Sequence, residues 1–482
     1  MTDTWMRIRG GTVIDGSGRP PMAATDVVVR GNRIVAVGDE TADGVTIPPR
    51  AEMATLDAAG LTVMPGLIDT HCHMSYGSGQ SQEEIDMWTS HELKTIIAAA
   101  NAEKVLRAGV TSVSEPGGNY FIGVGVREAI KRGLIPGPRM LSAGRYLTTS
   151  NGLTDWYPTS VGVPDGSIGT LTNTTDQMKD EIRRQVKNGV DLIKLADSAY
   201  GQLQAFTNDE LKSVADLTHQ LNRKCTIHAR ASAEVSAAVD AGFDWIMHGN
   251  ILDDDSIEKL AESKIPLVPT LLLLANRSDW PELTGGSPQV VNGARRMLER
   301  SADSYHRAVA AGVRFAMGTD TGFSVTPYGE WHARELELLA VYTGLSPLEA
   351  ITAGTRNGAL MMGLDGELGE IKPGYLADVI LVRGNPAEDL RVLLNKKNIV
   401  KVVKDGQVVR FSEGLDEKVF HVDRQPYVYS RVDLTYEMVF EDDARASYTT
   451  VPWSMSDARD LLRDVAQGQA ASVDPELESL SR

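Results

Sequence analysis

Cysteine, aromatic residues, positive charge and long apolar runs are all scarce in this chain of 482 residues. Two cysteines, Cys72 and Cys225, cannot build a disulfide framework. Lys and Arg number 48 against 65 Asp and Glu, and the net charge of −17 opposes nucleic acid and anionic membrane surfaces. The longest apolar run, residues 266–275, falls short of the roughly 18 to 20 residues needed to cross a bilayer. These absences argue against disulfide scaffolds, membrane proteins and nucleic-acid binders.

The composition that is present is typical of a folded protein. Apolar residues make up 42% and charged residues 23%, which excludes disordered and collagen-like chains. The first residues lack the cationic and then apolar pattern of a secretory signal, so we expect a cytoplasmic location. The length allows about two or three domains, or one large barrel with an appendage.

The order of strands and helices indicates an α/β protein. Residues 1–60 read as short strands with glycine turns, which predicts a small β module. Across residues 61–362, apolar strands alternate with amphipathic helices, a pattern typical of parallel strands with helical crossovers. Eight such strands predict a (β/α)8 TIM barrel, at residues 61–71, 111–115, 139–147, 190–196, 224–229, 245–248, 265–273 and 313–318.

The remaining residues form two further segments. Residues 363–411 return to strands, expected at 369–371, 378–382, 399–404 and 407–411. Neither this segment nor residues 1–60 has enough apolar surface to stand alone, so we expect the two to join as one small β-sandwich domain. Residues 412–482 form an extension with several aromatic positions and a predicted helix near 457–467. We expect this extension to mediate homo-oligomer contacts, or else to pack over its own sandwich or barrel.

Histidines stand at the ends of three predicted barrel strands. His71 and His73 are two residues apart on an extended segment, so their imidazoles face the same side. His228 and His248 end two later strands, and Asp320 follows the last one. Side chains at the carboxyl ends of barrel strands converge on one site.

Lys194 lies within the apolar strand 190–196. Elsewhere a lysine at an edge strand would extend to water, but inside a barrel its ammonium would repel any metal bound by the histidines. A desolvated lysine loses its proton readily and can act as a nucleophile. Reaction with carbon dioxide would convert it to a carbamate, an anionic ligand able to bridge two metals.

Taken in order, these residues resemble the amidohydrolase superfamily, in particular the binuclear metal hydrolases of its imidazolonepropionase and prolidase-like branch. The likeness rests on Gly66-Leu67-Ile68-Asp69-Thr70-His71-Cys72-His73, on Lys194, His228 and His248, and on Gly318-Thr319-Asp320-Thr321. Residues 10–16 and 371–379 are similar to the two halves of the small β-sandwich of that superfamily. The resemblance covers the chain to about Phe411.

The resemblance implies a division of labour among the ligands. His71, His73 and Asp320 would hold one divalent metal and His228 and His248 a second, with carboxylated Lys194 as the bridge. Such ligands suit zinc, with manganese, cobalt or iron as alternatives. A hydroxide shared by the two metals would attack the scissile carbonyl. Asp320 would deprotonate the water and then protonate the leaving nitrogen.

Four further residues are candidates for contacts to a substrate. Arg230 stands where many relatives carry a second histidine, and it could clamp a carboxylate or pair with a neighbouring acid. Tyr146, Tyr200 and His332 lie on loops after the predicted third, fourth and eighth barrel strands. The long insertion at residues 144–173 is expected to shape the pocket. Cys72 and Cys225 are expected to be apolar fillers that face away from the metals.

The sequence therefore favours a metal-dependent hydrolase that cleaves a C–N bond of amide, peptide, urea or carbamate type in a small molecule. A lactonase or organophosphate ester hydrolase would use the same site. A mononuclear deaminase is disfavoured because Lys194 is present, and a degenerate scaffold protein is disfavoured because all six ligands are intact. If Arg230 binds a carboxylate, N-acyl amino acids and dipeptides are favoured over neutral ureas, carbamates and anilides.

Overall fold

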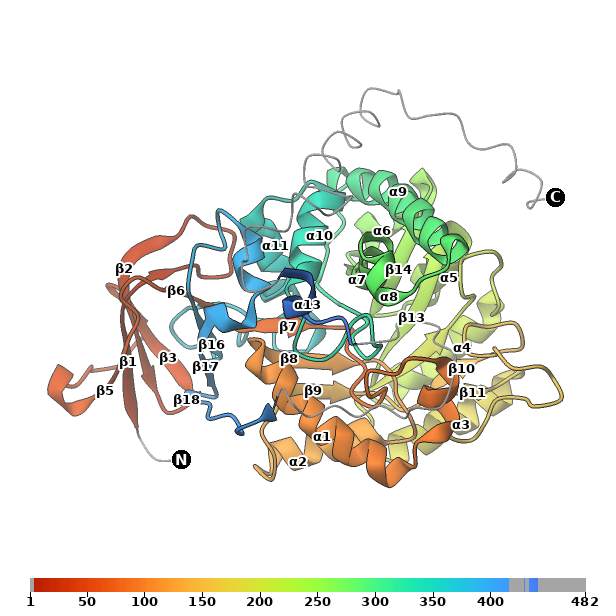
Figure 1. Cartoon of the computed structure of the whole chain (residues 1–482), viewed down its shortest axis with the longest axis horizontal. Helices are drawn as coiled ribbons and strands as arrows, with labels where there is room; N and C mark the ends of the chain where they lie inside the picture. Colours follow the sequence, from red (N-terminus) through yellow and green to blue (C-terminus); the bar gives the residue numbers. More distant parts are fainter. Residues whose placement is uncertain (1–3, 416–428, 430–432, 441–482) are drawn as a thin grey trace.

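A computed structural model describes residues 4–415, 429 and 433–440 of the chain (Figure 1). Its elements divide into a mainly antiparallel sheet at one end and parallel strands surrounded by helices (Figure 1). None of the helices in the described ranges is long and apolar enough to span a bilayer. The fold is mixed α/β.

The first sheet has nine strands and is built from both ends of the described chain. Its path runs β18-β17-β16-β6-β1-β2-β3-β4, and β5 pairs with β1. The strands are β1 (Trp5–Val13), β2 (Met22–Arg30), β3 (Arg33–Val37), β4 (Glu40–Thr41), β5 (Ala54–Asp57), β6 (Thr62–Pro65), β16 (Val379–Val382), β17 (Ile399–Lys404) and β18 (Gln407–Val408). β6 pairs antiparallel with β16, and Arg33 of β3 forms a bridge with Leu376, so residues from both ends of the described chain share this sheet.

The boundary of this sheet lies later than residue 60. β6 pairs with β1 and β16, so the sheet extends to Pro65. Gly66 then marks the change of partner: its amide donates to Asp378, whereas the amide of Leu67 donates to Gly109. A Cβ at Gly66 would lie 2.1 Å from Oγ1 of Thr111, so only glycine fits this close approach. One continuous apolar run serves two sheets, and its sequence gives no sign of the division.

The parallel strands form two hydrogen-bonded groups. The first is β7 (Leu67–Asp69), β8 (Val110–Glu115) and β9 (Arg139–Ser142). The second runs β11-β10-β12-β13-β14-β15 and comprises β10 (Tyr146–Thr148), β11 (Gly169–Leu171), β12 (Leu192–Ala196), β13 (Lys224–Ala231), β14 (Trp245–Ile251) and β15 (Leu267–Val268). Single parallel bridges join Leu267 to Phe315 and Cys72 to Thr321. The segment 315–321 therefore lies between the two groups.

The strand expected at 139–147 divides into β9 and β10, and two later strands are shorter than predicted. The strand expected at 265–273 ends at Val268, since Thr270 has a left-handed backbone and helix α7 (Leu272–Asp279) follows. The carboxylate of Glu335 accepts the amides of Leu271 and Leu272 and so stabilises the start of this helix. The strand expected at 313–318 forms only isolated bridges. Apolar content alone does not reveal these irregular segments.

Helices follow most of the parallel strands and cover them on the outside (Figure 1). Several begin at a side chain that caps the first turn; for example, Thr207 and Glu210 form a complete capping box. The other helices are α1 (His91–Arg107), α2 (Ile122–Lys131), α3 (Thr175–Lys187), α4 (Asn208–Gln220), α5 (Ser232–Ala241), α6 (Asp254–Ser263), α8 (Pro281–Thr284), α9 (Pro288–Ala310), α10 (Arg334–Thr343), α11 (Pro347–Ala353), α12 (Arg356–Met361) and α13 (Tyr436–Phe440). Short 3₁₀ or π turns occur at Arg50–Glu52, Glu84–Trp88, Leu390–Leu393 and Lys396–Asn398.

The described part of the C-terminal extension packs on its own chain. Leu434 is buried, its amide donates to Ser324, and its carbonyl accepts from the indole of Trp331. The ring of Tyr436 lies 6.2 Å from that of Trp331. These contacts favour the second expectation for the extension, packing over the barrel. The helix predicted near 457–467 lies outside the described residues.

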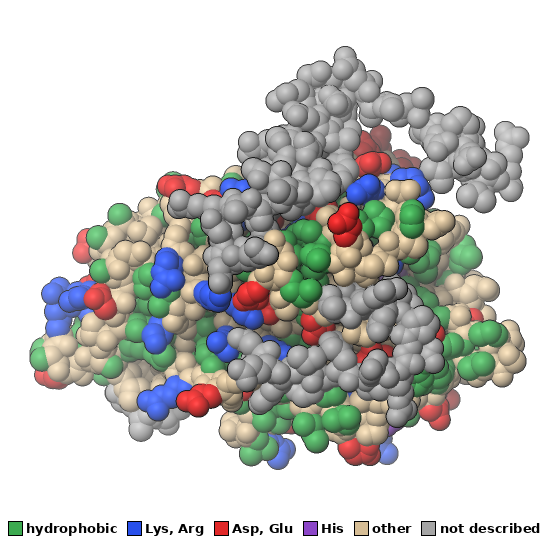
Figure 2. Space-filling model, viewed as in Figure 1, with side chains coloured by type: hydrophobic (Ala, Val, Ile, Leu, Met, Phe, Trp, Pro, Cys, Tyr) green, Lys and Arg blue, Asp and Glu red, His purple; other side chains and the backbone are tan. Residues whose placement is uncertain are grey.

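On the face shown in Figure 2, cationic and acidic side chains of the described residues are interspersed, without a continuous basic tract among them. Together with the net charge of −17, this distribution disfavours binding to a phosphate backbone.

Candidate metal centre

Six side chains named from the sequence meet in one cavity of about 520 Å³. Each comes from the carboxyl end of a parallel strand or from the segment that follows it: His71 and His73 after β7, Lys194 in β12, His228 in β13, His248 in β14 and Asp320 after the bridge at Phe315. All six residues are buried. The structure thus brings together residues that are up to 249 positions apart in the sequence.

Hydrogen bonds fix the orientation of the first two imidazoles. Nδ1 of His73 lies 2.7 Å from the carbonyl oxygen of Gly117, so this nitrogen carries the proton and donates it. Nδ1 of His71 lies 3.0 Å from Oγ1 of Thr270, whose hydroxyl donates to the carbonyl of Val268. Thr270 is therefore the acceptor for His71. In both rings Nε2 is left with its lone pair directed at the cavity.

These lone pairs face a carboxylate. Oδ1 of Asp320 lies 2.9 Å from Nε2 of His73 and 3.5 Å from Nε2 of His71. An anion that faces two nitrogen lone pairs is repulsive unless a cation lies among them. The three residues therefore fit a metal ion.

The second pair of histidines has unsatisfied ring nitrogens. Nε2 of His228 and both ring nitrogens of His248 are buried without a hydrogen-bond partner in the described structure. The two ring centroids are 4.2 Å apart. Burial lowers the pKa of both imidazoles well below its ordinary value, so each ring is neutral at physiological pH. Neutral, unpartnered imidazoles in a shared cavity have the chemistry of metal ligands.

Lys194 completes the group. It is almost fully buried, its Nζ atom contacts Sδ of Met247, and it lies 5.5 Å from the centre of the Tyr146 ring. Burial lowers the pKa of its ammonium to about 7, although the nearby Asp320 acts in the opposite direction. A large share of the amine is therefore unprotonated at neutral pH and available to react with carbon dioxide.

The backbone around the cavity is strained at three successive strand ends. His248, Thr270 and Asp320 have φ angles of 75°, 57° and 56°. Side chains other than glycine rarely adopt this left-handed region, and each instance costs on the order of 1–3 kcal/mol. The side chains of His248 and Asp320 line the cavity, and the hydroxyl of Thr270 lies 3.0 Å from Nδ1 of His71.

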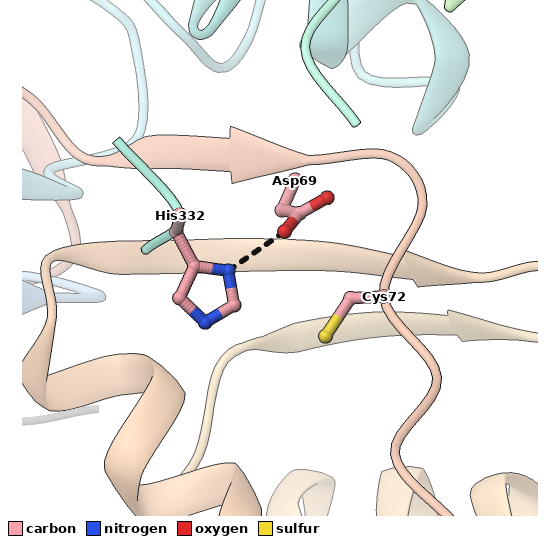
Figure 3. Close-up of side chains that lie close together, drawn as sticks. All are labelled: Asp69, Cys72 and His332. Atoms are coloured by element: carbon pink, nitrogen blue, oxygen red, sulfur yellow. Dashed lines mark hydrogen bonds and ion pairs between the residues drawn. The ribbon is translucent and has the colours of Figure 1, made fainter. Parts of the chain in front are cut away.

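A buried hydrogen-bond network behind β7 supports the first metal-binding residues. The carboxylate of Asp69 accepts the amide of His71 at 3.1 Å and both the amide and hydroxyl of Thr319. It also lies 2.7 Å from Nδ1 of His332 (Figure 3). Asp69 is part of the sequence motif that ends in His71-Cys72-His73, but the sequence alone predicted no role for it. The network links the segment of His71 to the segment of Asp320.

His332 differs from its sequence expectation. Its ring pairs with Asp69 (Figure 3), and Nε2 accepts the amide of Gly329. It does not belong to the residues that line the described cavity. The expected contact with substrate is therefore unsupported, because a loop position after a strand does not determine which side of the strand its side chain reaches. Cys72, also in Figure 3, lies in an apolar cluster with its thiol near Met74, as expected of a filler.

Tyr146, Tyr200 and Arg230 do line the cavity. The Tyr146 hydroxyl lies 3.1 Å from Nε2 of His73. Arg230 is already engaged within the protein: Nε donates to the carbonyl of Ala199, and a terminal nitrogen donates to the side chain of Asn250. Two of the five N–H groups of its guanidinium are therefore engaged by structural hydrogen bonds.

Several residues that line the cavity were not identified from the sequence. Among them are Tyr76, Trp156, Arg277, Phe323 and Tyr429. Trp156 belongs to the insertion that was expected to shape the pocket. The positions of these aromatic and apolar side chains depend on how the loops fold, which the sequence does not reveal. Tyr429 belongs to an extension for which no part in the site was expected.

Histidine and carboxylate side chains gathered at the carboxyl ends of parallel strands are of the kind that bind divalent metals in hydrolases. A sequence profile described as the Amidohydrolase family matches residues 62–409, and the chain belongs to that family. It is a hydrolase that acts on C–N bonds. Divalent metals are general in the family, and the grouping of His71, His73 and Asp320 is consistent with them.

Known proteins support this assignment over most of the chain. Ochratoxinase of Aspergillus niger is 29% identical over 436 residues, covering 84% of this chain and 86% of its own. Imidazolonepropionase of Symbiobacterium thermophilum is 25% identical over 406 residues, covering 80% of this chain and 89% of its own. Among solved structures, a Xaa-Pro dipeptidase with bound methionine is 26% identical with a TM-score of 0.73, over 84% of this chain and all of its own.

Proposed function

We propose that the cavity binds two divalent metal ions. His71, His73 and Asp320 would hold the first, His228 and His248 the second, and Lys194 would bridge them as a carbamate. Four observations support this assignment: the facing lone pairs at Asp320, the unpartnered nitrogens of His228 and His248, the lowered pKa of Lys194, and their common cavity. Zinc is the preferred metal, with manganese, cobalt and iron as alternatives.

Bound there, the ions would supply Lewis acidity that activates water and polarises a carbonyl. The chain's own residues would position the reaction. The Asp320 carboxylate would accept the proton of the attacking water at an oxygen and later deliver it to the leaving nitrogen. The Tyr146 hydroxyl stays protonated, since burial raises its pKa well above the ordinary value, and it would donate a hydrogen bond to the substrate oxygen.

The proposed substrate is a small molecule with an amide or dipeptide bond. The ochratoxinase and dipeptidase relatives favour such bonds, as does a prolidase structure in complex with N-methylphosphonate-L-proline, which is 25% identical with a TM-score of 0.74. The apolar and aromatic cavity wall suits a hydrophobic acyl or amino-acid group. The alternative is a lactone or organophosphate ester, which the same site chemistry could hydrolyse.

The test combines metal analysis with a substrate panel. The purified protein should contain about two equivalents of divalent metal. It should hydrolyse N-acyl amino acids or dipeptides faster than matched lactones and phosphotriesters, and a chelator should abolish the activity. A protein that binds no metal, or that cleaves only the esters, would contradict the proposed function.

We also propose the finer architecture and setting of this enzyme. The parallel strands would complete a (β/α)8 barrel, and the nine-stranded sheet would be a small β-sandwich domain. The enzyme would work in the cytoplasm as a homo-oligomer. Both cysteines are free and buried, which suits a reducing compartment.

A further inference from the structure

Arg277 is a cation in the cavity wall for which the described residues provide no acidic partner. It lies on α7, which follows β15, and its side chain is half-buried. Nε is buried without a hydrogen-bond partner, and the described residues provide no ion pair for the guanidinium. This is unusual in a chain with a net charge of −17.

Neighbouring arginines are paired. Arg334 forms an ion pair with Asp279 and a hydrogen bond with Asn276, which lie on either side of Arg277 along α7. Arg230, which also lines the cavity, donates to Ala199 and Asn250. A desolvated charge without a partner is costly, so an unpaired guanidinium at a cavity wall points to an anionic group supplied by a ligand.

The ring of Tyr429 contacts this guanidinium. The carbon at the centre of the Arg277 guanidinium is 6.0 Å from the centroid of the Tyr429 ring, within cation–π range. Tyr429 is itself fixed: its amide donates to Gln80, its hydroxyl donates to Gln82 at 3.0 Å, and its ring packs on Phe323 at 4.4 Å. A stacked guanidinium keeps its edge free, and that edge matches the two oxygens of a carboxylate.

We propose that Arg277, stacked by Tyr429, binds the free carboxylate of the substrate and so selects N-acyl amino acids and dipeptides. This inference rests on the proposed function. It assigns the carboxylate clamp to Arg277, whose guanidinium has no hydrogen bond or ion pair with the described residues, and not to Arg230, two of whose five N–H groups already donate within the protein. It also gives the C-terminal extension, through Tyr429, a part in substrate recognition.

The experiment compares substrates that differ only in the carboxylate. N-benzoylleucine and N-benzoyl-3-methylbutylamine share the acyl group, the scissile amide and the apolar side chain, and benzoate release reports both. The wild-type protein should show a kcat/KM at least about tenfold higher for the acid than for the neutral amide. A roughly tenfold difference is the lower end of what a hydrogen bond to a charged group contributes. Arg277→Met should lower kcat/KM for the acid by about 10- to 100-fold, mainly through KM, and leave the neutral amide unchanged.

Further variants separate recognition from folding. Arg277→Lys retains the charge but loses the planar fork, so it should recover part of the lost affinity for the acid. Arg295→Met is the matched control: Arg295 donates to Ser278 of α7 but does not line the described cavity, and both substrates should be unaffected. Equal loss for both substrates in Arg277→Met would overturn the carboxylate role.

The same measurements separate the carboxylate subsite from the proposed hydrolysis of C–N bonds. If the wild-type protein hydrolyses both amides with equal kcat/KM, C–N hydrolysis stands and the carboxylate subsite is wrong. If metal-loaded wild-type protein hydrolyses neither these amides nor a dipeptide series, the proposed function fails and the subsite fails with it.

Discussion

Lys194 is the residue whose chemistry depends most on its surroundings. Replacing it with alanine removes the proposed bridge, so we expect Lys194→Ala to retain less than half of the metal and to lose at least about 100-fold in kcat, with partial recovery in added formate or acetate. Metal analysis and amide hydrolysis measure both effects. Lys224→Ala, on the neighbouring strand outside the cavity, is the control. A fully metallated and active Lys194→Ala protein would contradict the bridging role.

The Asp320 carboxylate is expected to carry the proton transfers. Asp320→Asn keeps the size of the side chain but removes the base, and kcat should fall by about two to four orders of magnitude. Steady-state kinetics on a C–N substrate, with the metal content measured in the same sample, tests this. Turnover near that of the wild type with both metals retained would assign proton transfer to another group.

Local sequence and the family resemblance were sufficient to name the six residues proposed as metal ligands, which share the cavity. The pair His71 and His73, two residues apart on a strand, and the ends of β13 and β14 follow from periodicity and from a motif. Arg277 and Tyr429 could not be found in this way, because their place in the wall depends on contacts between segments far apart in the chain. His332 shows the opposite error, since its loop was identified correctly but its side chain pairs with Asp69.

At the scale of single elements, the end of β12 carries a titratable group that should affect stability. Asp197 is buried, and one of its oxygens accepts the amides of Ser198 and Ala205, while the other has no partner. Burial raises the pKa of this carboxyl to about 7, and the nearby Glu234 adds to the shift. The folded state therefore holds a proton that the unfolded state releases near pH 4.

The resulting stabilisation is present below about pH 4 and is lost as the pH rises through about 7. Its upper limit is about 4 kcal/mol, since one pKa unit corresponds to about 1.4 kcal/mol. Asp197→Asn keeps the amide acceptor and has no charge, so its Tm should fall less than that of the wild type between pH 5 and pH 8. Thermal unfolding at the two pH values measures this, and parallel pH profiles would contradict it.

The elements were predictable where they are regular. Strands β8, β13 and β17 fall within two residues of the expected limits, because apolar runs bounded by polar residues define them. The division between β6 and β7 was not predictable, since both halves are apolar and buried. The early end of β15 depends on the left-handed Thr270 and on Glu335, which is distant in sequence.

At the scale of the whole molecule, the C-terminal extension connects the cavity to the rest of the chain. A protein ending at Leu415 lacks Tyr429 and the buried Leu434, so we expect kcat/KM for anionic amides to fall by about 2- to 30-fold, the worth of a cation–π contact. Tyr429→Leu in the full chain should reproduce most of this loss.

Light scattering on the same two proteins tests the assembly role of the extension. A homo-oligomer that dissociates on truncation but not in Tyr429→Leu would support that role. If the truncated protein keeps both its assembly state and its activity, neither proposed role of the extension is correct.

The nine-stranded sheet has a consequence for synthesis of the chain. The hydroxyl of Thr62 donates to the carbonyl of Gly384, 322 residues later, and β6 lacks its β16 partner until that point has been made. The N-terminal strands therefore leave the ribosome with an unpaired edge. Because synthesis proceeds at about 5 to 20 residues per second, this edge stays unpaired for tens of seconds. Closure of this sheet should be the last step of folding, after the metal-binding residues have already met, and the unpaired edge of β6 is the place where a newly made chain is most exposed to aggregation.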